Sequence, residues 1–239
     1  MISPWMTKII GKLPEGLLKY ISNKVMYGYI NKYADLTVKG DENLDNIKKP
    51  VIYICNHLSN ADGLVLNSIL REKDDVTFVA GVKLNNNSLT NLGMHVVKTT
   101  PVKPNTPDKD GLKKIINIVK EGGSILIFPE GTRSRQGKLI EAKKGITLIA
   151  KLTKVNIVPI AITGTENLLP ISQSGRMERE KFQHAKVTVT VGKEFVLPKI
   201  EKDEDKKDFE ERCLNTFMYK IAEMLPDEYK GVYNKSNLG

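Results

Sequence analysis

Short apolar runs alternate with helical patterns along most of this chain. The runs are rich in β-branched residues and too short for helices, which is typical of strands buried in a sheet. The predicted strands are Val51 to Cys55, Val76 to Ala80, His95 to Lys98, Ser124 to Phe128, Asn156 to Ile162 and Lys186 to Val191.

The stretches between these runs place apolar residues at every third or fourth position, which is the spacing of amphipathic helices. The predicted helices are Ala61 to Arg71, Asp108 to Glu121, Lys143 to Leu152 and Asp205 to Leu225. Continuous apolar strands need cover on both faces, and the intervening helices can supply it. The pattern therefore predicts an α/β fold, with a central mixed, largely parallel sheet flanked by helices.

The N-terminal segment differs from the rest, because lysines flank its apolar residues throughout. Apolar residues at helical spacing occupy residues 5–13, Pro14 interrupts them, and a second set follows over residues 17–33. A basic amphipathic pair of helices with Trp and Tyr has the composition of a membrane-interface element, and a pair packed on the main domain would show the same periodicity. We therefore divide the chain into an N-terminal amphipathic two-helix appendage, residues 1–34, and a main domain, residues 35–239.

The chain is basic, with a formal net charge of +9 over 239 residues. Such a balance implies an anionic partner, either a membrane surface or nucleic acid. Aromatic residues make up 6% of the chain and do not interleave with a basic patch, as they do in proteins that bind single strands. We therefore expect an anionic membrane surface as a partner and no nucleic acid.

The longest apolar runs fall well short of the roughly 20 residues that a membrane-spanning helix needs, so we expect no transmembrane helix. The first residues also lack the continuous apolar core of a secretory signal. Cys55 and Cys213 form neither a disulfide framework nor a metal-ligand pattern, which favours a reducing compartment and no metal site. Since Cys55 lies inside an apolar run, we interpret it as a core residue rather than a nucleophile.

A histidine and an aspartate follow the first predicted strand, five residues apart in the stretch from Asn56 to Gly63. On one continuous helix this separation would point the two side chains apart. The spacing instead places His57 in a strand-to-helix loop and Asp62 in the first helical turn, where they can meet. When a carboxylate accepts a hydrogen bond from one ring nitrogen of a neutral imidazole, the other ring nitrogen can take a proton from an alcohol. The same spacing also suits a histidine and an aspartate that only cap a helix.

A second polar block, Phe128 to Ser134, follows another predicted strand. Its residues lie at the carboxyl end of that strand, where open α/β sheets bind ligands. Glu130 can hold a substrate hydroxyl or orient Arg133, and Arg133 can grip a phosphate in a bidentate fork. Gly131 permits a backbone geometry that a Cβ would forbid. The block lacks the Gly-Lys-Ser/Thr ending of a Walker loop, and by itself it also fits a surface salt-bridged turn.

Together and in this order, the two blocks resemble the glycerolipid acyltransferase family, whose best-known members acylate 1-acyl-glycerol-3-phosphate. The resemblance covers roughly residues 35–195 and implies that His57 and Asp62, preceded by Asn56, form the catalytic signature. It also implies that the block Phe-Pro-Glu-Gly-Thr-Arg binds the phosphorylated acceptor. The residues so implied in substrate binding are Asn56, Glu130, Gly131, Thr132 and Arg133.

Other parts of the chain match this family less fully. Val158-Pro159-Ile160 resembles its fourth block, which implies that Pro159 ends a strand on the acyl-donor side. The family commonly has an Asp-Arg pair between the two main blocks, whereas here Val96-Val97 leads to Lys98-Thr99. We expect Lys98 to supply the missing charge, and Lys83, in an altered upstream motif, to assist Arg133.

The resemblance implies transfer of a fatty acyl group from acyl-coenzyme A or acyl carrier protein to the free hydroxyl of 1-acyl-glycerol-3-phosphate. We expect no cofactor beyond that co-substrate, and a peripheral, monotopic location on the cytoplasmic face of the cell membrane. Another lysophospholipid or glycerol phosphate remains an alternative acceptor. Outside this class, the residues also fit a non-catalytic protein that binds anionic lipid or nucleic acid, or a hydrolase acting on a thioester.

Overall fold

The computed structural model describes residues 14–81, 93, 95–103, 106–172 and 180–234. Within these residues, seven strands form one sheet in the order β1-β7-β6-β2-β5-β3-β4. Neighbouring strands run parallel except β6 and β7, which are antiparallel. The strands are β1 (Ala34–Lys39), β2 (Val51–Cys55), β3 (Thr77–Gly81), β4 (Thr99–Val102), β5 (Ile125–Ile127), β6 (Asn156–Thr163) and β7 (Ala185–Val191). The prediction of a mixed, largely parallel sheet is confirmed.

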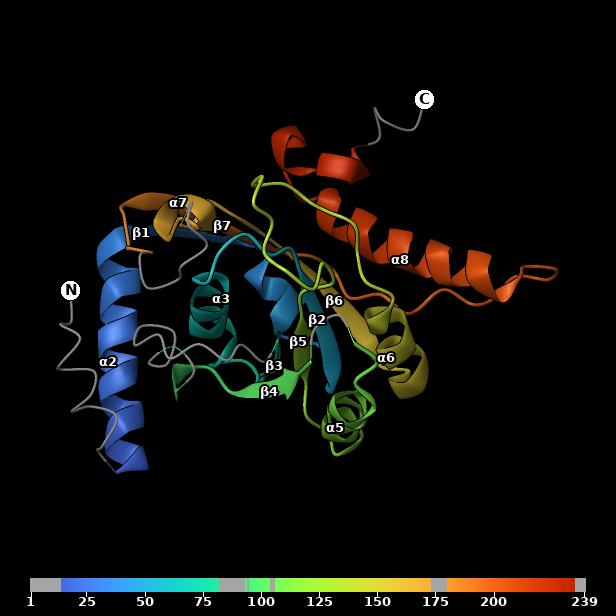
Figure 1. The fold of residues 1–239 in the computed structure, drawn as a ribbon, viewed down its shortest axis with the longest axis horizontal. Coiled ribbons are helices and arrows are strands. Elements are labelled where there is room, and N and C mark those ends of the chain that lie inside the picture. The colour runs from blue at the N-terminus through green and yellow to red at the C-terminus, as the bar shows by residue number, and fades with distance from the viewer. Residues whose placement is uncertain (1–13, 82–92, 94, 104–105, 173–179, 235–239) are drawn as a thin grey trace.

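Helices cover both faces of this sheet (Figure 1). The α-helices are α2 (Glu15–Tyr33), α3 (Asp62–Leu70), α5 (Lys109–Lys120), α6 (Gly145–Thr153), α7 (Thr165–Leu168) and α8 (Lys206–Ala222), and the 3₁₀ helices are η1 (Asp41–Leu44), η3 (Asp227–Tyr229) and η4 (Gly231–Tyr233). In Figure 1, α2 and α3 lie on one side of the central strands and α5, α6 and α8 on the other. The sheet is thus the middle layer of a three-layer structure.

Strand β2 explains why the central strands are apolar throughout. Its residues are all buried, and Val51, Tyr53 and Cys55 join the core under α2 and α3. Ile52 and Ile54 join the core under α5, α6 and α8. Because successive side chains point to opposite faces, a strand covered on both sides has no polar position.

The predicted strand from His95 to Lys98 is wrong. Gly93, His95 and Val96 are helical, and β4 begins only at Thr99. Two buried valines stand between an exposed His95 and an exposed Lys98, which does not fit the alternation of a half-buried strand. His95 is therefore an exposed helical residue.

The sequence analysis also missed the strand β1, whose residues alternate between half-buried and exposed positions. It lies at the edge of the sheet beside β7, in the register Leu36 to Val187. Only part of its surface is buried, so its apolar signal is weaker than that of the central strands.

Helix α2 packs on the main domain. Leu18, Met26 and Ile30 are buried in the core shared with α3. Asn67 Nδ2 on α3 donates to the hydroxyl of Tyr27 on α2 at 2.6 Å. The other predicted N-terminal helix and its residues 1–13 lie outside the described part of the chain. The boundary between the appendage and the main domain stays a prediction.

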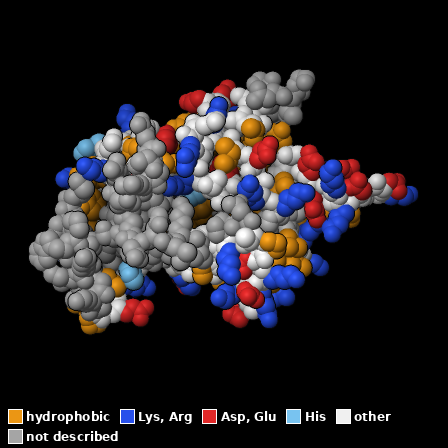
Figure 2. All heavy atoms as spheres, viewed as in Figure 1, with side chains coloured by type: hydrophobic (Ala, Val, Ile, Leu, Met, Phe, Trp, Pro, Cys, Tyr) orange, Lys and Arg blue, Asp and Glu red, His pale blue; other side chains and the backbone are white. Residues whose placement is uncertain are grey.

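Among the described helices, none combines the length and apolarity that crossing a bilayer requires. On the face seen in Figure 2, Lys and Arg side chains alternate with Asp and Glu around α5, α6 and α8. The positive charge around these three helices is therefore spread out rather than gathered in one patch.

Candidate active site

The loop after β2 is tied to the neighbouring strand β6 by Asn56. The side-chain amide of this fully buried residue donates to the carbonyl of Ile162 at 2.8 Å and accepts from the N–H of Ile162, also at 2.8 Å. The next residue in the chain is His57. We expected Asn56 to contact substrate, but its side chain instead holds the loop in place.

His57 and Asp62 meet across this loop, as the spacing predicts. His57 Nδ1 lies 2.7 Å from Asp62 Oδ2, and Asp62 is fully buried in the first turn of α3. The same Oδ2 accepts the backbone N–H groups of Leu58 at 2.7 Å and Ser59 at 2.9 Å. An ionised carboxylate can only accept hydrogen bonds, so Asp62 favours a proton on the ring nitrogen that it contacts, Nδ1.

The imidazole also packs on the second block. The rings of His57 and Phe128 are stacked, with centroids 4.1 Å apart and an angle of 16° between their planes. The His57 side chain remains 20% exposed. Asp62 and Phe128 therefore orient a ring that a substrate can still reach.

Glu130 supports the backbone of His57. Its fully buried carboxylate accepts the N–H of His57 through Oε1 at 2.7 Å and the N–H of Ile140 through Oε2 at 3.0 Å. Burial raises the pKa of Glu130 to about 8, and the hydrogen bonds from the two backbone N–H groups oppose that effect. We expected Glu130 to hold a substrate hydroxyl or to orient Arg133. The structure instead assigns it to the loop that carries the imidazole.

The turn between the two charged residues of this block requires its glycine. Gly131 has φ +68°, and a Cβ there would lie 3.0 Å from Cγ of Lys143. This left-handed conformation disfavours residues with a Cβ. Gly131 and Thr132 are both exposed at the carboxyl end of β5.

Arg133 pairs with Glu180, a residue that the sequence analysis missed. The guanidinium Nη1 lies 2.8 Å from Glu180 Oε1, and the two side chains are 10% and 2% exposed. Glu180 Oε2 accepts from Asn60 Nδ2 at 2.6 Å. Glu180 belongs to no motif and is separated from Arg133 by 47 residues, so no local pattern could have identified it.

The sequence matches the Acyltransferase family over residues 35–163, which is more than half of the chain. This chain belongs to the acyltransferase family. Together with the relatives described next, this match confirms the resemblance of the two blocks to glycerolipid acyltransferases.

Several relatives carry a more specific name. A chloroplastic 1-acyl-sn-glycerol-3-phosphate acyltransferase of Arabidopsis thaliana is 30% identical over 166 residues, covering 69% of this chain and 44% of the relative. A 1-acyl-sn-glycerol-3-phosphate acyltransferase of Chlamydomonas reinhardtii is 30% identical over 203 residues, covering 83% of this chain and 55% of the relative. This acyltransferase-family chain thus spans about half the length of the curated relatives it matches.

A solved structure shares the fold. The crystal structure of the 1-acyl-sn-glycerophosphate acyltransferase PlsC from Thermotoga maritima superimposes with a TM-score of 0.61 at 22% sequence identity. The match covers 88% of this chain and 81% of the other. Because it covers most of both chains, the match supports the overall fold.

Lys98 does not lie at the candidate site, contrary to our prediction. Its ammonium pairs with Asp75 at 2.6 Å, and both side chains are exposed. These residues precede β4 and β3, whereas the two blocks follow β2 and β5. Since these strands run parallel, Lys98 lies at the opposite edge of the sheet. Lys83 lies outside the described residues.

The resemblance led us to predict that Pro159 ends a strand, and this prediction is wrong. It lies in the middle of β6, is buried, and is in register with Ile54 of β2. Its carbonyl accepts the N–H of Gly192 at 2.8 Å. The strand continues for several residues beyond it, because the buried run from Ile157 to Ile162 pairs with neighbours on both sides.

Cys55 has the environment of a core residue. It is fully buried, and burial raises the pKa of its thiol well above the usual value, with Asp62 and Glu130 adding to the effect. A thiol in such surroundings is unreactive. Cys55 and Cys213 are both free. Over the described residues, no group of three or more His, Cys, Asp or Glu side chains could hold a metal ion.

Proposed function

We propose that this chain transfers a fatty acyl group from an acyl thioester to the free hydroxyl of 1-acyl-glycerol-3-phosphate, with phosphatidate as the product. The observation that carries the proposal is the His57–Asp62 pair, oriented by 2.7 Å contacts at the carboxyl end of β2. The names of the relatives support the choice of acceptor.

In this reaction His57 Nε2 takes the proton of the acceptor hydroxyl as its oxygen attacks the thioester carbonyl. Asp62 stabilises the imidazolium that forms. The tetrahedral intermediate then collapses, the C–S bond breaks, and the imidazolium returns the proton to the leaving sulfur. A thiol with a pKa of about 8.5 is a good leaving group, so the chemistry needs no cofactor beyond acyl-coenzyme A or acyl carrier protein.

Arg133 is the proposed partner of the acceptor phosphate. It follows β5, the strand beside β2, so its loop and that of His57 leave the same edge of the sheet. A guanidinium matches phosphate oxygens in a bidentate geometry. The acceptor would therefore be held by its phosphate at one loop and deprotonated at the other.

The substrate is a lipid, and we infer that the protein works at the cytoplasmic surface of an anionic membrane. On α2, Leu17 is 46% exposed and Tyr20 is 64% exposed. These two residues are three positions apart and thus share one side of the helix. Apolar side chains on a chain of net positive charge suit a peripheral association.

The direct test incubates the protein with a labelled long-chain acyl thioester and 1-acyl-glycerol-3-phosphate. Replacing the base in His57→Ala should lower the transfer rate about 10²–10⁴-fold, the usual range for general-base catalysis. His95→Ala is the matched control, because His95 is exposed and lies on a different segment. The product of the wild-type protein should be phosphatidate. The His95→Ala variant should form it at the same rate as wild type.

Other products would redirect the proposal. Free fatty acid released without acceptor would identify a thioester hydrolase. Transfer only to glycerol phosphate or to another lysophospholipid would keep the reaction and change the acceptor. Equal activity of wild type and His57→Ala would contradict the assigned base, and no turnover with any acceptor would favour a lipid-binding protein.

A further inference from the structure

Glu180 joins the two blocks of the site. Its carboxylate oxygens contact separate partners, with Oε1 on Arg133 at 2.8 Å and Oε2 on Asn60 at 2.6 Å. Asn60 belongs to the loop between His57 and Asp62, and Glu180 precedes β7. Three segments that are distant in the sequence thus meet at one buried carboxylate.

The Glu180 carboxylate is buried, so its stability depends on the two partners that it contacts. The Glu180 side chain is 2% exposed, and a buried carboxylate is costly unless it is paired and hydrogen-bonded. Arg133 is 10% exposed, so its long side chain is already restricted before any substrate binds. The ion pair uses Nη1, one part of a planar group with five N–H donors.

We propose that Glu180 is a positioning residue, which holds the Arg133 guanidinium in the orientation that receives the acceptor's phosphate. This inference rests on the proposed function. An arginine that is ordered in advance loses less conformational entropy when the phosphate binds. Asn60 donates to the other carboxylate oxygen and so holds Glu180 in place, whereas His57 is held separately by Asp62 and Glu130.

The first test measures steady-state kinetics of Glu180→Ala at varied acceptor and at varied acyl thioester. The acceptor KM should rise about three- to tenfold, the effect of one side chain that must be immobilised on binding. The kcat at saturating acceptor and the KM of the thioester should change less than twofold. Glu180→Gln keeps an acceptor oxygen for Arg133 and should recover part of the loss.

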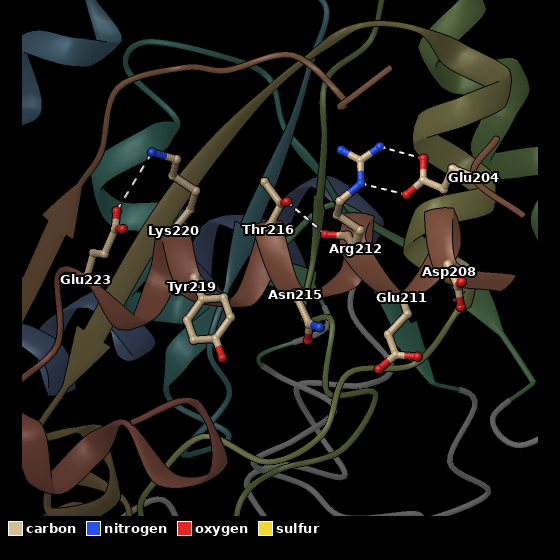
Figure 3. Close-up of a pocket in the computed structure, with 9 residues that line it drawn as sticks. All are labelled: Glu204, Asp208, Glu211, Arg212, Asn215, Thr216, Tyr219, Lys220 and Glu223. Carbon is tan, nitrogen blue, oxygen red and sulfur yellow. Dashed lines mark hydrogen bonds and ion pairs between the residues drawn. The ribbon is translucent and has the colours of Figure 1, made fainter. Parts of the chain in front are cut away.

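The chain offers a matched control on α8. Glu204, just before this helix, pairs with Arg212 on it, with Oε1 2.7 Å from Nε and Oε2 2.6 Å from Nη2, along a groove on the outer face of the helix (Figure 3). Glu204→Ala also removes a carboxylate from an arginine. It should leave the acceptor KM unchanged, while thermal melting shows whether each variant is folded.

A double-mutant cycle separates positioning from a general loss of structure. Arg133→Ala alone should raise the acceptor KM, and Glu180→Ala should add little in that background because the group it orients is gone. Independent, additive effects of the two substitutions would overturn the proposal. So would a lower acceptor KM in Glu180→Gln, because Glu180 would then compete with the phosphate.

Calorimetric binding of a short-chain 1-acyl-glycerol-3-phosphate, without thioester, tests the inference apart from turnover. The affinity should fall in Glu180→Ala and stay unchanged in Glu204→Ala. If wild type binds this acceptor but transfers no acyl group to it, the proposed function fails and the role of Glu180 stands. If wild type transfers and both Glu180 variants match it in KM and affinity, the role of Glu180 fails alone.

Discussion

At the scale of single residues, the imidazole is held from more directions than the His and Asp spacing predicted. Asp62 fixes its tautomer, Phe128 lies against its ring, and Glu130 accepts its backbone N–H at 2.7 Å. Two of these contacts come from the block after β5. The blocks are therefore one structural unit, in which the second supports the imidazole of the first.

Glu130 should make stability depend on pH. Its folded pKa, about 8, is above the usual value of 4.5, so the folded state binds the proton more tightly than the unfolded chain. The stabilising contribution is complete below pH 4.5 and is lost as the pH rises toward 8. Urea unfolding between these limits should show a fall in the free energy of unfolding.

Glu130→Gln identifies the group responsible. This variant should be less stable than wild type at low pH, because an amide cannot accept both backbone N–H groups. Its free energy of unfolding should vary less between pH 5 and pH 8. A pH dependence equal to that of wild type would show that another group titrates.

At the scale of elements, loops at the carboxyl edge of the sheet are fixed by hydrogen bonds to the backbone of neighbouring segments, from side chains and from main chain. Asn56 joins the loop after β2 to β6 through its side-chain amide, whose nitrogen donates to the carbonyl of Ile162 and whose oxygen accepts the N–H of Ile162. Ser134 N–H, after β5, donates to the carbonyl of His57 at 2.8 Å. The position of His57 thus depends on β2, β5 and β6 together.

Removing the Asn56 amide should weaken both the fold and the site. Asn56→Ala leaves the N–H and carbonyl of Ile162 without their partner in a buried position, at a cost of about 2–4 kcal/mol. Urea denaturation measures this loss. Asn156→Ala, which removes an exposed amide bonded to Glu194, should change stability by less than about 1 kcal/mol. Equal effects of the two variants would refute the role of Asn56.

At the scale of the whole molecule, α2 combines a buried side with an exposed apolar one. Deleting the helix would remove Leu18, Met26 and Ile30 from the core that they share with α3, so the deletion would damage the fold as well as any membrane contact. Substitution of the exposed side is a cleaner test. Leu17 and Tyr20 are the residues to change.

The double variant Leu17→Ser/Tyr20→Ser should sediment less with anionic vesicles, by roughly tenfold in partition coefficient, because two apolar side chains no longer enter the interface. Val232→Ser is the control, since Val232 is 53% exposed on η4. It should bind vesicles as wild type does. Unchanged sedimentation of the double variant would limit α2 to packing on the main domain.

The sequence alone was sufficient for features with a strong local signal. The strand Val51–Cys55 was predicted to the residue, because a strand buried on both faces is apolar at every position. The meeting of His57 and Asp62 also followed from local spacing, since both belong to one strand-to-helix connection. Gly131 marked a turn that only a left-handed conformation completes.

Tertiary structure alone decided the features that depend on neighbours distant in the chain. The sequence around Lys98 did not reveal on which edge of the sheet this residue lies, because that depends on which ends of the parallel strands share an edge. Glu130 binds backbone amides, and every residue except proline offers such a group, so no sequence pattern reveals the pairing. Glu180 meets Arg133 and Asn60 only when three segments fold together. The chemistry of the site is thus encoded locally, whereas its rigid support is a property of the packed molecule.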